Sequence, residues 1–276
     1  MDKFSKIEKA LQTKRILKDP DCENKYAIFS DLHLGIGNSN DNSLKNANFT
    51  FEALKYYLEN DYHVILNGDT FELAENRDIE LIKRVHENIM WVLSELHKKG
   101  LLTIVKGNHD SNLTSDMLRY RKSSYTKKEE IFIDDTYIYD SAVIYSDLTY
   151  IIMHGHQVLW QYQPFLNGFI NFIIRNIWAP FEKFLLKDPT SELDGFEDYT
   201  TVDKPFSDYA TEHNCIAICG HTHSVQLSKP HYYNIGGGTL PRCITVGEIV
   251  EGKYQAYKWS YVVDHQVVLI KKSPLD

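Results

Sequence analysis

Residues 101–110 read LLTIVKGNHD, an apolar run that passes directly into an amide, an imidazole and a carboxylate. The apolar part is typical of a strand that is buried on both faces of a sheet. A turn accounts for Gly107 and Asn108, because both residue types tolerate positive φ. A turn has no need of His109, so the stretch raises the question of whether other strands also end in polar clusters.

Four further stretches show the same arrangement of an apolar run followed by polar side chains. They are YAIFSDLHLG at 26–35, HVILNGDTFEL at 63–73, YIIMHGH at 150–156 and CIAICGHTH at 215–223. Five repetitions of one arrangement are hard to explain by chance. We therefore read the polar residues at these strand ends as parts of one site.

Helical patterns lie between the first strands. FTFEALKYYLEN at 49–60 has helical spacing, and IELIKRVHENIMWVLSELHKKG at 79–100 predicts one amphipathic helix that is closed by Gly100. Strands that alternate with helices in this way predict a mixed α/β fold. From residue 131 onward short strands and turn residues predict hairpins, and residues 243–272 predict a closing β meander.

The totals restrict the class of protein. The chain has 276 residues and a formal net charge of −8, which disfavours a general nucleic-acid binder. Four scattered cysteines are too few for a disulfide framework in a chain of this length. We find neither a signal peptide nor an apolar run long enough to cross a membrane, so we expect a cytoplasmic protein.

We expect one domain over residues 26–276, preceded by a basic extension over 1–25. Residues 1–18 carry six Lys or Arg against two Asp or Glu, with a weak apolar stripe. This pattern predicts a solvated surface helix that ends near Pro20, and the alternative is an anchor to anionic lipid at a membrane surface. Residues 157–205 are rich in aromatic residues and then acidic, which is typical of an insertion.

Oxygen atoms of Asp and Asn together with imidazoles are ligands that suit Mn, Fe or Zn, and the absence of thiolates argues against a structural zinc site. Asp31 and His33 are two residues apart, so in a strand they would face the same way, as would His221 and His223. Ligands at the carboxyl ends of strands converge where α/β sites normally form.

The series SDLHLG, NGDTFE, KGNHD, MHGH and CGHTH resembles the calcineurin-like metallophosphoesterase superfamily, over residues 26 to about 260. The resemblance implies a four-layer α/β/β/α sandwich with two divalent metal ions at one edge, most simply Mn²⁺, with Fe or Zn as alternatives. It implies a metal-bridging hydroxide that attacks phosphorus. Carried over by position, Asp31, His33 and His223 hold the first ion, Asn108, His154 and His221 hold the second, and Asp69 bridges both.

The same resemblance leaves His109 to act on the substrate, where an imidazolium would stabilise or protonate the leaving oxygen. Gly107 would let the backbone turn tightly enough to direct both Asn108 and His109 into the site. Asp110 has two alternative roles that are equally open: it orients His109, or it is an ordinary carboxylate of the turn. His156 either supports the ligand next to it or is merely a surface residue.

Within the superfamily, GDTFEL and the segment from His154 to Pro180 are similar to UDP-2,3-diacylglucosamine pyrophosphohydrolases, which have a helical lid there. This similarity implies an amphiphilic or nucleotide-sugar-like phosphorylated substrate, a helical lid over about 157–205, and Arg175 as a contact to a substrate phosphate. The chain departs from those enzymes at His109, where they usually carry Arg, and at His156, where they carry Asp. A phosphoprotein phosphatase, a general phosphodiesterase and a catalytically silent scaffold are the alternatives. The oligomeric state is left open.

Overall fold

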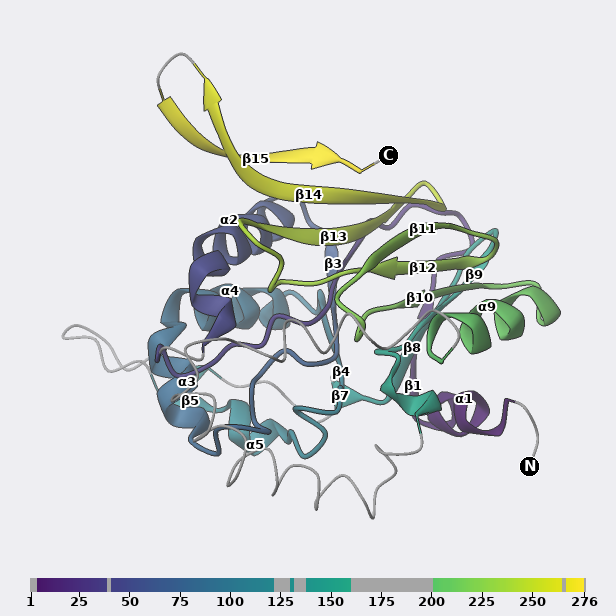
Figure 1. Ribbon diagram of the computed structural model, residues 1–276, viewed down its shortest axis with the longest axis horizontal. Coiled ribbons are helices and arrows are strands. Elements are labelled where there is room, and N and C mark those ends of the chain that lie inside the picture. The colour runs from purple at the N-terminus through teal and green to yellow at the C-terminus, as the bar shows by residue number, and fades with distance from the viewer. Residues whose placement is uncertain are drawn as a thin grey trace.

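The computed structural model describes residues 4–38, 41–121, 130–131, 138–159, 201–264 and 267–275. Two sheets lie face to face in this part of the chain, with helices on their outer sides (Figure 1). The first sheet has the order β15-β14-β13-β2-β3-β4-β7 and the second has the order β1-β8-β9-β10-β12-β11. A short pair, β5 Tyr120–Arg121 and β6 Glu130–Ile131, stands apart from both.

The strands of the first sheet are β2 Tyr26–Phe29, β3 His63–Asn67, β4 Leu102–Val105, β7 Ile138–Tyr139, β13 Cys243–Val250, β14 Lys253–Asp264 and β15 Val267–Pro274. Those of the second sheet are β1 Lys14–Lys18, β8 Ser141–Tyr145, β9 Thr149–Ile152, β10 Ile216–Cys219, β11 Val225–Lys229 and β12 Tyr232–Ile235. The helices are α1 Ser5–Ala10, α2 Ala47–Glu59, α3 Ile79–Val85, α4 Glu87–Lys98, α5 Ser115–Leu118 and α9 Asp203–Glu212, with 3₁₀ turns η1 Leu11–Thr13, η2 Asn42–Asn46 and η4 His156–Val158.

Alternation along the central strands explains why both of their faces are buried. In β3, Val64 and Leu66 pack toward α2 and α4, whereas Ile65 between them packs toward the second sheet. Successive side chains of a strand point to opposite faces, so an unbroken apolar run supplies two cores at once. Ile144 and Ile218 complete the core between the sheets.

A third core lies on the outer face of the second sheet. Phe206 and Ala210 of α9 pack there with Phe4 and Ile7 at the N-terminus, against Val143 of β8. The order of layers is therefore helices, sheet, sheet, helices, which confirms the four-layer sandwich that the sequence predicted. The hairpin β8–β9 and the antiparallel meander β13–β14–β15 are confirmed as well.

The segment that was predicted as one amphipathic helix is two helices in the structure. The break falls at His86, whose backbone has left the helical region at φ −108° and ψ 36°. The His86 ring is buried, and its Nε2 lies 3.6 Å from Oδ2 of Asp41. This buried contact with a distant residue holds His86 at the break, although the apolar periodicity of the sequence continues through it. Gly100 does follow α4, with φ +71°, as predicted.

The prediction of a solvated N-terminal surface helix was wrong. The helix ends at Ala10, not near Pro20, and the chain continues into β1, which pairs in parallel with β8. Phe4 and Ile7 are buried in the third core, and the Phe4 ring lies 5.1 Å from the ring of Tyr209. Residues 14–18 therefore belong to the second sheet.

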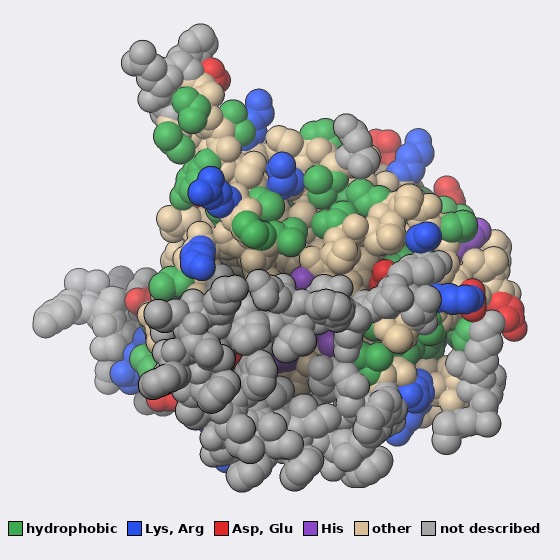
Figure 2. Space-filling model, viewed as in Figure 1, with side chains coloured by type: hydrophobic (Ala, Val, Ile, Leu, Met, Phe, Trp, Pro, Cys, Tyr) green, Lys and Arg blue, Asp and Glu red, His purple; other side chains and the backbone are tan. Residues whose placement is uncertain are grey.

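The hairpin of β14 and β15 extends beyond the body of the protein (Figure 1) and carries exposed apolar side chains (Figure 2). The helical lid was predicted over about 157–205, and its residues 160–200, which include Arg175, lie outside the residues that the structure describes. Among the helices that are described, none combines the length and the apolar character needed to cross a membrane.

Candidate metal centre

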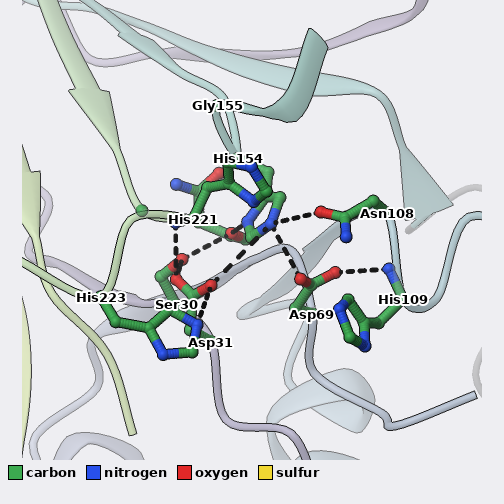
Figure 3. Close-up of polar contacts among 12 residues, drawn as sticks. Ser30, Asp31, Asp69, Asn108, His109, His154, Gly155, His221 and His223 are labelled. Atoms are coloured by element: carbon green, nitrogen blue, oxygen red, sulfur yellow. Dashed lines mark hydrogen bonds and ion pairs between the residues drawn. The ribbon is translucent and has the colours of Figure 1, made fainter. Parts of the chain in front are cut away.

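The five polar clusters follow the carboxyl ends of five strands. β2, β3 and β4 run parallel in the first sheet, and β9 and β10 run parallel in the second. The carboxyl ends of parallel strands meet at one edge, which brings the loops after them together. Figure 3 shows seven of the predicted residues converging there: Asp31, Asp69, Asn108, His109, His154, His221 and His223. His33 belongs to the same cluster, because its ligand atom lies within 4.8 Å of those of Asp31 and His223.

The loops aim these side chains by adopting left-handed backbone conformations. Asp31, His33 and Asp69 have φ of +53°, +45° and +48°, and His221 and His223 have φ of +69° and +52°. Residues other than glycine rarely adopt such angles, and each costs on the order of 1–3 kcal/mol. The expectation that strand alternation aligns each pair was therefore wrong, because β2 stops at Phe29 and β10 stops at Cys219.

Gly107 serves close packing here and not a left-handed turn. Neither Gly107 nor Asn108 has a positive φ, contrary to the prediction. A Cβ built on Gly107 would lie 2.0 Å from Oδ1 of Asp69, a distance that no side chain tolerates. The glycine thus lets the loop after β4 press directly against the Asp69 carboxylate, whose Oδ1 accepts a hydrogen bond of 2.8 Å from the His109 amide.

The first group of ligand atoms surrounds Asp31. Oδ1 of Asp31 lies 3.2 Å from Nε2 of His223 and 3.9 Å from Nε2 of His33, and these two nitrogens are 3.2 Å apart. The other oxygen, Oδ2, accepts hydrogen bonds from the Ser30 hydroxyl and, at 3.0 Å, from the His221 amide. Nδ1 of His223 lies 3.0 Å from the Thr239 hydroxyl, which leaves Nε2 as the nitrogen directed at Asp31.

The second group surrounds His154, which is fully buried. Its Nδ1 donates to the backbone carbonyl of Asn67 at 3.0 Å, so Nε2 is the ring nitrogen that is directed into the cluster. That Nε2 lies 3.0 Å from Oδ2 of Asp69 and 3.2 Å from Oδ1 of Asn108. The His221 ring lies beside it, with ring centroids 5.0 Å apart.

Asp69 lies between the two groups. Its Oδ2 is 3.9 Å from Nε2 of His33 and 3.0 Å from Nε2 of His154. Ligand atoms of Asp31, His33 and His223 fall within 4.8 Å of one another, and those of Asp69, His154 and His221 do so as well. His33, Asp69 and His109 form a third such group, so His109 also lies within reach of an ion.

The carboxylates and imidazoles of this cluster shift one another's pKa values. Burial alone would raise the pKa of Asp69, but the imidazoles of His154 and His109 hold it well below its usual range. Asp31 behaves likewise, its pKa being lowered by His154 and His223 against the effect of burial. Burial lowers the pKa of His154, yet the Asp69 and Asp31 carboxylates outweigh this and raise it to about 9.

The donor set fits divalent metal ions. Oδ1 of Asp31 is buried and accepts no hydrogen bond from the described residues, although imidazole nitrogens lie around it. A buried carboxylate oxygen among imidazole nitrogens is the kind of atom that coordinates a divalent cation. The Nδ1 contacts of His33, His154 and His223 orient their Nε2 atoms inward, as metal-binding histidines require.

Glu72 is a residue of the site to which the sequence analysis gave no role. Its carboxylate is buried, and its two oxygens each lie 2.8 Å from Nδ1 of His109. Oε2 is also 2.7 Å from Nδ1 of His33. The signal in the sequence was an acidic residue between Phe71 and Leu73, in an apolar setting where a carboxylate needs a partner.

Asp110 and His156 have different surroundings. Asp110 accepts hydrogen bonds from the Gly107 amide at 2.7 Å and the Thr70 amide at 2.8 Å, so it ties two site loops together while Glu72 holds the His109 ring. Burial and the nearby Asp69 raise the pKa of Asp110 to about 6. His156 lies with its ring centroid 5.4 Å from that of His154, against the ligand cluster.

The solved structures that are similar to this chain include two Vps29 proteins. Vacuolar protein sorting 29 from Cryptosporidium parvum is 14% identical with a TM-score of 0.39, and the match covers 91% of this chain and 97% of that one. Wild-type Vps29 from Entamoeba histolytica, solved in complex with Zn²⁺, is 14% identical with a TM-score of 0.37, covering 91% and 98%. At these values the likeness carries no argument about function.

No protein of curated function matches the sequence. The sequence model of the calcineurin-like phosphoesterases matches residues 25–225, which is nearly three quarters of the chain and contains every residue of the cluster described above. The chain therefore belongs to the calcineurin-like phosphoesterase family and is a metal-dependent phosphohydrolase.

Proposed function

We propose that this protein hydrolyses a phosphoester or pyrophosphate bond with the help of two divalent metal ions. We favour Mn²⁺ as the metal, with Fe or Zn as the alternatives. The observation that carries the proposal is the convergence of two groups of ligand atoms on a shared carboxylate, Asp69. In this assignment Asp31, His33 and His223 hold one ion. Asn108, His154 and His221 hold the other.

Bound ions would supply a water-derived nucleophile at neutral pH and would neutralise the phosphoryl oxygens. The protein contributes the rigidity of the site. Five of the assigned ligand residues are buried: Asp31, Asp69, Asn108, His154 and His221. The loops that carry them are tied together by contacts such as those of Asp110 to Gly107 and Thr70. A rigid cluster keeps the reacting groups aligned, and alignment of this kind is worth about 7–11 kcal/mol of the barrier in favourable cases.

His109 is the residue that we assign to the leaving group. Both oxygens of Glu72 lie at its Nδ1, so Nδ1 carries a proton and Nε2 is the ring atom that would transfer one. The negative charge of Glu72 favours the imidazolium form of His109. A protonated ring at this place stabilises the charge that develops on the leaving oxygen and then protonates it.

The substrate that we propose is amphiphilic or nucleotide-sugar-like, on the support of the aromatic, apolar residues of 157–205 in the sequence. A panel of substrates with Mn²⁺ tests this: p-nitrophenyl phosphate, bis-p-nitrophenyl phosphate, a UDP-sugar and UDP-diacylglucosamine. Preference for the acylated pyrophosphate supports the proposal. Preference for the monoester or the diester assigns the protein to phosphatases or phosphodiesterases, and no turnover of any substrate with any of the three metals refutes catalysis.

A further inference from the structure

A pocket of about 310 Å³ opens beside the metal centre. Its lining includes Lys6 and Lys9 from α1, Lys106 and Gly107 from the end of β4, and His156 from η4. Nothing in the proposed function uses these lysines. The volume is at the lower end of the range of small-molecule sites, which is about 300–1,000 Å³.

The pocket shares a wall with the metal centre. Gly107 directly precedes Asn108, and its α-carbon packs against the Asp69 carboxylate. The His156 ring lies with its centroid 5.4 Å from that of His154 and 6.3 Å from that of His221. A substrate whose phosphate is at the metal centre would therefore have its neighbouring atoms at the mouth of this pocket.

The helix that supplies two of the lysines is held in place by its own contacts. Phe4 and Ile7 are buried, and the Ser141 hydroxyl donates to the carbonyl of Ala10 at 2.9 Å. The ammonium of Lys6 donates to the carbonyl of Val158 at 2.7 Å, which joins α1 to the segment that follows the HGH motif. The lysines are therefore presented by a packed helix beside β1 (Figure 1).

The charge of the pocket is opposite to that of the chain. Among the residues that the structure describes, three lysines line the pocket against one acidic residue, Asp140, which already accepts a hydrogen bond from the Thr13 hydroxyl. The chain as a whole carries a formal charge of −8, so a local excess of lysines is not a general surface property. Lysine ammonium groups in a hollow attract anions and are common ligands of phosphate.

We propose that this pocket binds a second phosphate group of the substrate while the phosphate that is cleaved lies at the metal centre. The inference rests on the proposed function and specifies its substrate class: a compound with two phosphate groups, either on separate carbons or joined as a diphosphate. Lys9 and Lys106 are the residues that recognise the second group, and Lys6 both contributes charge and fixes α1.

Competitive inhibition of p-nitrophenyl phosphate hydrolysis tests the inference, because it does not require that the probes be turned over. The probes are two matched pairs, fructose 1,6-bisphosphate with fructose 6-phosphate and ADP with AMP, at saturating Mn²⁺. The wild-type protein should bind the two-phosphate member of at least one pair more tightly by about tenfold or more. The pair that shows the preference identifies whether the second phosphate is separate or joined.

The variant Lys9→Gln/Lys106→Gln should reduce this preference to less than about threefold. Lys18→Gln, which removes an exposed charge of β1 outside the pocket lining, should retain it. Melting temperatures check folding, and Lys9→Gln alone, on an exposed helix position, should reduce the preference in part. The inference is overturned if the wild-type protein shows no preference for either pair, or if the preference survives in the double variant.

A failure of the proposed reaction can be distinguished from a failure of the second phosphate site. If the wild-type protein hydrolyses no p-nitrophenyl phosphate with any divalent metal, the proposed reaction is at fault. Calorimetric titration of the same four probes then tests the pocket by itself, with the same two variants and the same outcomes.

Discussion

The carboxylate of Glu72 places both of its oxygens 2.8 Å from Nδ1 of His109, and one of them also lies 2.7 Å from Nδ1 of His33. One buried acidic residue thus fixes the ring orientation of a proposed metal ligand and of the proposed proton donor. The two imidazoles hold the pKa of Glu72 below its usual range, against the effect of burial. The contact joins metal binding and proton transfer in a single hydrogen-bonded unit.

Replacing Glu72 by Gln should lower kcat by about 10–100-fold, the range found when the hydrogen-bond partner of a site histidine is removed. The amide keeps the shape but loses the charge that favours a protonated His109. The pH at which activity is lost on the alkaline side should therefore move down, because a less basic His109 loses its proton earlier. Steady-state kinetics across pH measures this, with Glu59→Gln on the exposed end of α2 as the matched control. An unchanged pH profile would contradict the assignment.

His109→Ala should retain both metals and lose kcat by about 10²–10⁴-fold, the usual range for general acid catalysis. The loss should be smaller for p-nitrophenyl phosphate, because p-nitrophenolate is a good leaving group that hardly needs a proton. Elemental analysis measures the metal content of the variant. Its rates on an alkyl phosphate and on the p-nitrophenyl ester show whether the loss of kcat depends on the leaving group. Loss of a metal ion would instead make His109 a ligand, as its distance to His33 and Asp69 allows.

Asp69→Asn should abolish activity more completely than any change of a ligand that serves one ion. Asp69 contacts Nε2 of both His33 and His154, so its charge balances both positions. Metal content should fall at both sites, whereas His223→Asn should reduce it at one. An Asp69→Asn protein with near two equivalents of metal and normal turnover would refute the bridging role.

Metal binding should release protons near neutral pH. In the metal-free protein the pKa of His154 is raised to about 9, so its ring is charged at neutral pH. A histidine ligand must be neutral, so binding has to displace this proton. Proton release, measured by calorimetry in buffers of different ionisation enthalpy, should decline as the pH rises through about 9, where the ring is already neutral. Release that does not change over this range would show that His154 is not a ligand.

Much of the fold could be predicted because the apolar runs are unambiguous. Strand β3 is buried at every position and has an apolar run, Val64 to Leu66, between two cores, and α2 has the spacing of an amphipathic helix. The convergence of the five polar clusters followed from the parallel arrangement of the strands that precede them. These features depend on patterns that are local in the sequence.

The features that could not be predicted depend on contacts between distant segments. The break at His86 depends on Asp41, and the integration of the N-terminus depends on the pairing of β1 with β8. The left-handed conformations of Asp31 and His221 could not be predicted from residue type alone, because Asp and His adopt them more often than most residues but still only in a minority of positions. The sequence could indicate that Glu72 needs a partner but not which one, because its two imidazole partners are 37 and 39 residues away.

The central claim is that this cluster holds two metal ions that share Asp69. Anomalous diffraction at the manganese edge, from crystals of the protein loaded with Mn²⁺, tests it most directly. We predict two peaks, one among Asp31, His33 and His223 and the other among Asn108, His154 and His221. Asp69 should contact both. A single peak, or peaks outside this cluster, would contradict it.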